Sequence, residues 1–153
     1  MQRDILFVCL GNICRSPAAE AVFRERAPAG MRIDSAGTGG WHAGEPPYAP
    51  MQAAAAARGY DLASLRARQF TAADFDRFGH LIAMDDKNRA DMERLRPAGN
   101  DTPIRLLMDF APELGIEHVP DPYYTRDFNG ALDLIEEAVL GLFAAVALDG
   151  VQA

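Results

Sequence analysis

The sequence contains little cysteine, and this excludes a disulfide-held extracellular scaffold. Its 153 residues include two cysteines, Cys9 and Cys14, too few for the framework of a small secreted domain. Long hydrophobic runs are also lacking. The most apolar late stretch, Ala138 to Leu148, is shorter than the roughly 20 residues that a helix needs to cross a bilayer. No secretory signal precedes the first apolar segment. We therefore expect a cytoplasmic protein, with export by a route that needs no signal peptide left open.

Positively charged residues are also fewer than negatively charged ones. The chain has 15 Lys and Arg against 22 Asp and Glu, a formal net charge of −7. Such a balance disfavours nucleic acid or an anionic membrane as a partner, and we expect neither. The apolar share of 49% and the charged share of 24% are ordinary for a soluble globular protein. The length predicts a single domain spanning residues 1–153.

The most informative stretch that is present runs from Val8 to Pro17. Before it, residues 5–8 form a short continuous apolar run, typical of a buried parallel strand. After it, Ser16 is predicted as a helix N-cap and Pro17 as the first helical residue. The segment therefore predicts a strand, a tight loop and a helix. Its backbone amides converge where an anion would bind.

Within this loop, Cys9 and Arg15 are separated by five residues. Thiolate is the reactive form of cysteine, and a helix N-terminus and a guanidinium both favour it. Arg15 offers a planar fork that matches two phosphoryl oxygens. Gly11 allows close approach of the backbone, and Asn12 tolerates a left-handed conformation. The pattern predicts phosphoryl transfer through a cysteinyl-phosphate. Because Arg15 and the amides neutralise phosphoryl charge, no metal and no cofactor are expected.

Alternating strands and helices along the rest of the chain predict a parallel sheet covered on both faces. Further strands are expected at Met31–Asp34, His80–Met84 and Ile104–Met108, and a Gly-rich turn from Ala36 to Gly44. Helices are expected from the loop to about Ala27, over Pro50–Arg58 and Ala72–Arg77, from Asp85 or Asp86 to about Leu95, and from about Gly130 to Leu148.

The Val8–Pro17 segment resembles the signature loop of the low-molecular-weight protein tyrosine phosphatases. The resemblance spans nearly the whole chain, in order, through Asp34–Thr38, Ala67–Gln69, Met84–Asp85 and Asp121–Tyr124. It implies an α/β fold of flavodoxin-like, three-layer αβα type with a four-stranded parallel sheet. It also implies metal-independent hydrolysis of phosphotyrosine in protein substrates.

A phosphate monoester with a poor leaving group needs a proton donor from another loop. Asp121, between two prolines, is the candidate, and the resemblance assigns it as general acid and then general base. The resemblance further implies that the Ser16 hydroxyl stabilises the Cys9 sulfur and that Ser35 helps to hold Asn12. The predicted phosphate-binding loop comprises Leu10, Gly11, Asn12, Ile13, Cys14 and Ser16.

One departure from the family concerns loop support. Leu65 stands where many relatives have histidine. Since a leucine side chain makes no hydrogen bond, Asn12 must be held differently here, or less well.

Other positions allow two interpretations each. Cys14 is either a packed loop residue or, as the family suggests, a resolving thiol that traps oxidised Cys9 as a disulfide. Trp41, Tyr123 and Tyr124 are expected to wall an aryl pocket, with Leu10 and Ile13 at its mouth, or else to pack ordinarily. The three histidines, His42, His80 and His118, share no metal-ligand spacing, and Asp85 and Asp86 are interpreted as helix caps.

Two alternative functions remain at this point. An arsenate reductase of the same fold would relay a disulfide through two further cysteines, and none follows Cys14. A non-catalytic phosphate-binding module would need neither Cys9 nor Asp121. The sequence leaves open the physiological substrate and whether the protein is a monomer or a weak dimer.

Overall fold

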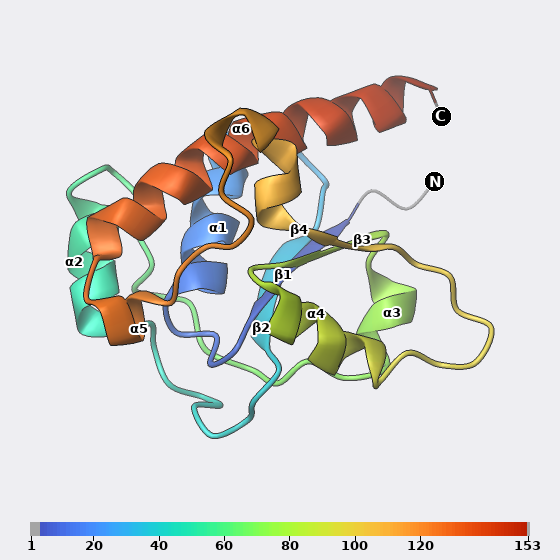
Figure 1. Cartoon of the computed structure of the whole chain (residues 1–153), viewed down its shortest axis with the longest axis horizontal. Coiled ribbons are helices and arrows are strands. Elements are labelled where there is room, and N and C mark those ends of the chain that lie inside the picture. The colour runs from blue at the N-terminus through green and yellow to red at the C-terminus, as the bar shows by residue number, and fades with distance from the viewer. Residues whose placement is uncertain (1–3, 153) are drawn as a thin grey trace.

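The computed structural model describes residues 4–152, with side chains up to residue 147, and is built on a four-stranded parallel sheet (Figure 1). Its strands lie in the order β2-β1-β3-β4. They are β1 (Ile5–Cys9), β2 (Ile33–Gly37), β3 (His80–Ala83) and β4 (Ile104–Leu106). The helices are α1 (Arg15–Arg24), α2 (Ala49–Ala56), α3 (Asp74–Arg77), α4 (Asp86–Glu93), α5 (Pro122–Thr125) and α6 (Phe128–Gln152), with 3-10 turns η1 (Leu107–Phe110) and η2 (Pro112–Leu114). The predicted fold class is confirmed.

Both faces of the sheet are buried, which explains the continuous apolar run in β1. Ile5 and Phe7 belong to one hydrophobic cluster, to which α1 and α6 contribute most of the helical side chains. Leu6 and Val8 belong to a second cluster, with residues of α3 and α4. Figure 1 shows α1, α2 and α6 on one side of the sheet and α3 and α4 on the other. Because alternate side chains of a strand face opposite ways, burial of both faces requires four consecutive apolar residues.

The topology places a ligand site at the carboxyl end of β1. This strand lies between β2 and β3; the connection that leaves β1 forms α1 on one side of the sheet, and the connection that leaves β3 forms α4 on the other. Open parallel sheets bind ligands at such a switch point. Cys9 is the last residue of β1, and Asp85 follows closely after β3.

The loop-to-helix boundary differs from the prediction. Helix α1 begins at Arg15, and its N-cap, Cys14, makes no side-chain capping hydrogen bond. Ser16 therefore lies inside the first turn, and its prediction as N-cap was wrong. Its hydroxyl instead lies 3.0 Å from the Cys9 sulfur.

The observed strand boundaries also differ from the predicted ones. β2 continues to Gly37, where a turn was expected from Ala36, because Ala36 and Gly37 pair in parallel with Val8 and Cys9. The last strand ends at Leu106, before the 3-10 turn η1.

The helices differ from their predicted bounds at the ends. Helix α1 stops at Arg24, before the expected Ala27, whereas α6 begins at Phe128 and runs to Gln152, past both of its expected ends. Long as α6 is, no helix within the described residues combines the length and the apolar character that membrane crossing requires.

Candidate active site

The Cys9 sulfur forms the base of the site, with two hydrogen-bonding groups of the loop directed at it. The backbone N–H of Asn12 donates to the sulfur at 3.3 Å, and the Ser16 hydroxyl lies 3.0 Å from it. Cys9 is 3% exposed. Its position at the end of a central strand fixes its backbone, and the loop wraps around its side chain. A sulfur held in this way is surrounded by groups that stabilise negative charge.

Asn12 adopts the predicted left-handed conformation, with φ of 58°. Three hydrogen bonds hold its side chain. The amide nitrogen donates to Ser16 Oγ at 2.8 Å and to Ser35 Oγ at 2.9 Å, while the amide oxygen accepts from the backbone N–H of Arg68 at 3.0 Å. Ser35 therefore contacts Asn12 as expected. The Arg68 amide supplies a third hydrogen bond to Asn12, in a chain where Leu65 offers none.

Arg68 is itself firmly held. Its guanidinium pairs with Asp34 of β2 and with both carboxylate oxygens of Asp74, which is fully buried. The backbone amide that supports Asn12 is thus tied to two other elements. Leu65 packs against the larger hydrophobic cluster.

The peptide planes of the loop are fixed by bonds to its carbonyls. The carbonyls of Cys9 and Leu10 accept from the N–H groups that follow β2, those of Thr38 and Gly39, each at 2.9 Å. Gly37 makes this approach possible, because a Cβ there would lie 2.7 Å from the Leu10 carbonyl oxygen. The loop is therefore preorganised by the neighbouring strand.

Arg15 is buried and anchored through one side of its guanidinium. Nη1 donates to Asp85 Oδ2 at 2.7 Å and to the Val119 carbonyl at 3.0 Å, while Nη2 makes a longer contact of 3.4 Å with Asp121 Oδ2. Burial lowers the pKa of Arg15, but the charges of Cys9, Asp121 and Asp85 outweigh it, so the pKa lies above its ordinary value. Arg15 therefore remains a cation at the site.

Asp85 is a functional residue that the sequence reasoning treated only as a helix cap. It does cap α4, accepting from the Asn88 N–H at 2.8 Å. Its second oxygen holds Arg15. The two residues are 70 positions apart, so no local pattern joins them; the sequence signal at Asp85 is the family resemblance that covers Met84–Asp85.

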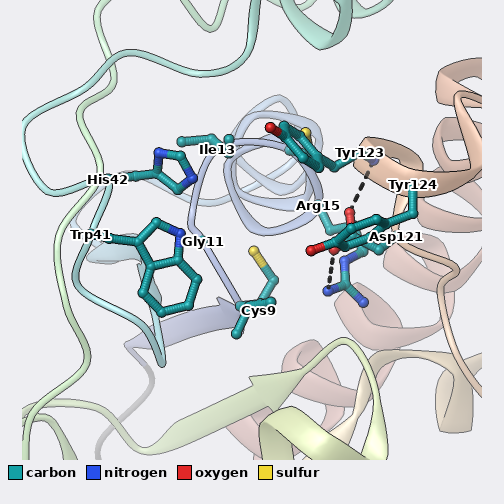
Figure 2. A pocket seen from close by; sticks show the side chains of 11 residues that line it. Cys9, Gly11, Ile13, Arg15, Trp41, His42, Asp121, Tyr123 and Tyr124 are labelled. Carbon is teal, nitrogen blue, oxygen red and sulfur yellow. Dashed lines mark hydrogen bonds and ion pairs between the residues drawn. The ribbon is translucent and has the colours of Figure 1, made fainter.

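Asp121 caps α5 with one oxygen and faces Arg15 with the other. Oδ1 accepts from the Tyr123 N–H at 3.0 Å, and Pro122 occupies the first position of the helix. This short helix presents Asp121, Tyr123 and Tyr124 to the pocket, as Figure 2 shows. The two prolines and the cap thus position the carboxyl on a separate loop, where the sequence placed it.

A cavity of about 290 Å³ opens above the Cys9 sulfur (Figure 2). This volume is near the lower end of small-molecule sites and suits a single aromatic group. All three predicted aromatic walls line it: Trp41, Tyr123 and Tyr124. The other lining residues are Cys9, Leu10, Gly11, Ile13, Cys14, Arg15, His42 and Asp121.

His42 is the lining residue that the sequence reasoning missed. The sequence showed only that it lacks metal-ligand spacing with the other histidines, whereas its ring stands beside Trp41 at the pocket wall in Figure 2. Nδ1 pairs with Glu45 Oε2 at 2.6 Å. A Cβ at Gly11 would lie 3.1 Å from the His42 ring. The glycine therefore makes room for this side chain.

Cys14 is buried and, like Cys9, a free thiol. Burial, with the nearby charges of Cys9 and Asp121, raises the pKa of Cys14 to about 12. Cys14 is therefore a neutral thiol near pH 7, and its redox role stays a prediction. Among residues 4–152, no group of three or more His, Cys, Asp or Glu side chains is placed to hold a metal ion.

Comparison with known proteins places this chain in a family. The family model "Low molecular weight phosphotyrosine protein phosphatase" matches residues 4–152. A Bacillus subtilis relative named "Low molecular weight protein-tyrosine-phosphatase YfkJ" is 40% identical over 148 residues, covering 94% of this chain and 95% of the relative. A Streptomyces coelicolor low molecular weight protein-tyrosine-phosphatase is 45% identical, covering 95% and 94%.

Solved structures agree with the sequence matches. The crystal structure of YfkJ superposes with a TM-score of 0.92 at 38% identity, covering 97% of each chain. A protein tyrosine phosphatase from Entamoeba histolytica, with Hepes in its active site, gives 0.88 at 34% identity, covering 96% of this chain and 98% of that one. Cys9 and Arg15 fit the Cys-x5-Arg pattern of the loop. The chain belongs to the low molecular weight phosphotyrosine protein phosphatase family.

Proposed function

We propose that this chain is a single-domain, metal-independent protein tyrosine phosphatase that works through a cysteinyl-phosphate. One observation carries the proposal: a cysteine sulfur at the base of an aryl-sized cavity, with Asn12 and Ser16 hydrogen-bonded to it and Arg15 and Asp121 lining the same cavity. Nucleophile, anion clamp and proton donor are thereby present in one pocket.

In the first step the Cys9 thiolate attacks phosphorus, and the bond from phosphorus to the aryl oxygen breaks. Arg15 and the loop amides bind the phosphoryl oxygens, where charge develops. Asp121, in its protonated form, gives its proton to the departing phenolate oxygen. Oδ1 accepts from the Tyr123 N–H at 3.0 Å, whereas Oδ2 has only the longer contact of 3.4 Å with Arg15 Nη2, so we assign this proton to Oδ2.

In the second step a water molecule attacks the phosphorus, and the sulfur–phosphorus bond breaks. Asp121, now a carboxylate, takes a proton from the water. The products are inorganic phosphate and the Cys9 thiolate, which the Ser16 hydroxyl stabilises as it leaves.

The aromatic walls support a phosphotyrosine substrate. Trp41 and Tyr124 are 65% and 73% exposed, so their rings offer stacking surface at the mouth of the cavity. The names of the Bacillus and Streptomyces relatives point to the same substrate class. We infer phosphorylated proteins in the cytoplasm as the substrates.

The proposal is tested by hydrolysis of phenyl phosphate in the presence of EDTA, comparing the unaltered protein with Cys9→Ser and Asp121→Ala. We expect turnover by the unaltered protein, none by Cys9→Ser, and strongly reduced turnover by Asp121→Ala. Activity that survives in Cys9→Ser would exclude the cysteinyl-phosphate. An inactive unaltered protein that still binds phosphate would favour a binding module.

A further inference from the structure

A buried carboxylate lies next to the catalytic loop, and the proposed reaction does not use it. Glu20 of α1 is 2% exposed. Its Oε1 accepts from the Ser35 hydroxyl at 2.7 Å, and its Oε2 accepts twice from the Arg24 guanidinium, at 2.8 and 3.0 Å. Ser35 is in turn a partner of Asn12. Glu20 is thus the far end of a chain of side chains that reaches the Cys9 sulfur.

The donors and acceptors of this chain run in one direction. An ionised carboxylate only accepts, so the single hydroxyl hydrogen of Ser35 points to Glu20. Ser35 Oγ is then an acceptor for the amide nitrogen of Asn12, whose second hydrogen goes to Ser16. Because Ser16 Oγ accepts from Asn12, its own hydrogen is available to the Cys9 sulfur at 3.0 Å.

Two fixed groups set this direction, one at each side of Asn12. The backbone N–H of Arg68 can only donate, which assigns the amide oxygen of Asn12 to it. The Glu20 carboxylate can only accept, which assigns the hydrogen of Ser35. The other acceptor within reach of Ser16, the Ala36 carbonyl, is farther away at 3.4 Å. The hydrogen of Ser16 is therefore directed to the sulfur.

Direct electrostatics does not explain a carboxylate at this place. A negative charge on Glu20 repels the anion formed at the sulfur and the phosphate that binds there. Burial also raises the pKa of Glu20 above its ordinary value, although its bonds with Ser35 and Arg24 oppose this. Any benefit of Glu20 to the reaction must therefore pass through the hydroxyl and amide groups that lie between Glu20 and the Cys9 sulfur.

We propose that Glu20 is a positioning residue that keeps the Ser16 hydroxyl hydrogen and the Asn12 N–H on the Cys9 sulfur through Ser35 and Asn12. The inference rests on the proposed function of Cys9. A glutamine at this position has one acceptor oxygen, so it cannot accept from Ser35 and Arg24 at the same time. Its NH₂ group would face either the Ser35 oxygen, which already accepts from Asn12, or the Arg24 guanidinium, which is also a donor.

This chain of hydrogen bonds predicts which step of the reaction depends on Glu20. Hydrogen bonds to the sulfur are strongest when it is a thiolate, before the first step and again as the second step ends. They weaken while the sulfur is bonded to phosphorus. Loosening them therefore slows breakdown of the cysteinyl-phosphate but does not slow its formation. A loss of fold would lower both rates.

The experiment uses p-nitrophenyl phosphate with rapid-mixing kinetics on the full chain and four variants: Glu20→Gln, Ser35→Ala, the double variant, and Glu25→Gln. Glu25, five positions along the chain, is exposed and gives the matched control. We expect Glu20→Gln to lower kcat about tenfold and KM with it, leaving kcat/KM within about threefold, and to enlarge the burst of p-nitrophenol. Glu25→Gln should match the unaltered protein.

The double variant tests whether Glu20 acts through Ser35. If it does, the double variant is no slower than Ser35→Ala alone, whereas independent effects would multiply. The inference is overturned if kcat of Glu20→Gln stays within about twofold of the unaltered protein, if the two effects multiply, or if kcat/KM falls as far as kcat. An unaltered protein without turnover, or an active Cys9→Ser, would instead refute the proposed function, and the inference with it.

Discussion

Replacement of Asp121 by asparagine removes proton transfer and the contact with Arg15 but keeps the cap that this residue gives to α5. Asparagine keeps an oxygen that accepts from the Tyr123 N–H, so the start of α5 is preserved. Its NH₂ group takes the place of Oδ2, the atom 3.4 Å from Arg15 Nη2. The variant can still donate a hydrogen bond to the leaving oxygen, but it cannot transfer a proton.

Loss of the Arg15 contact and loss of proton transfer have effects of different size, so the two can be told apart. The contact with Arg15 is long, and Arg15 keeps its shorter bonds with Asp85 and the Val119 carbonyl, so we expect its loss to cost on the order of 1 kcal/mol of folding free energy. General acid catalysis contributes about 10²- to 10⁴-fold. For phenyl phosphate, whose leaving group resembles tyrosine with a pKa of about 10, we expect kcat/KM to fall about 10²- to 10³-fold. This corresponds to about 2.7–4 kcal/mol of barrier.

The assay compares phenyl phosphate with p-nitrophenyl phosphate, whose more acidic leaving group needs little protonation. We expect kcat/KM for p-nitrophenyl phosphate to fall much less than for phenyl phosphate. For both substrates kcat should fall, because the shared second step loses its base. Asp127→Asn is the matched control: Asp127 is an exposed aspartate that accepts from the Gly130 N–H at the start of α6. An equal fall of kcat/KM for the two substrates would refute the assignment of Asp121 as general acid.

Three further outcomes are expected. Asp85→Asn keeps the cap of α4 but loses the charged partner of Arg15. Urea denaturation should therefore show a loss of about 1–2 kcal/mol in unfolding free energy. An unchanged unfolding free energy would mean that the ion pair does not stabilise the fold. After peroxide treatment, a thiol reductant should restore the unaltered protein, whereas Cys14→Ser should recover less activity; equal recovery would remove the resolving role. Burial raises the pKa of Glu20 in the native state. The unfolding free energy of the unaltered protein therefore falls as pH rises from 4.5, the ordinary pKa of Glu, through the raised value. Unfolding measured across this range should therefore show Glu20→Gln gaining stability relative to the unaltered protein with rising pH, and a flat difference would contradict the raised pKa.

The predicted features that the structure confirms are those encoded locally. The apolar run of β1, the left-handed Asn12 and the cap at Asp85 each depend on a few neighbouring residues. Tyr123 and Tyr124, which lie in a segment that carries the family resemblance, line the cavity together with Trp41. Errors fell at element ends, such as Ser16 and Ala36. At Ala36 a strand distant in sequence competes with the local preference for a turn, and at Ser16 the hydroxyl bonds to Cys9 and Asn12 within the loop instead of capping the helix.

By itself, the sequence determined the strand–loop–helix around Cys9 and the negative overall charge, because backbone preferences and composition need no distant partner. Only the tertiary structure decided which groups hold Arg15 and in which direction the hydrogen bonds from Glu20 to Cys9 run. These contacts join segments up to 106 positions apart. Their energies depend on distances and burial that no spacing along the chain encodes. The tertiary structure likewise brings the backbone amide of Arg68 to Asn12, support that the sequence did not reveal beside Leu65.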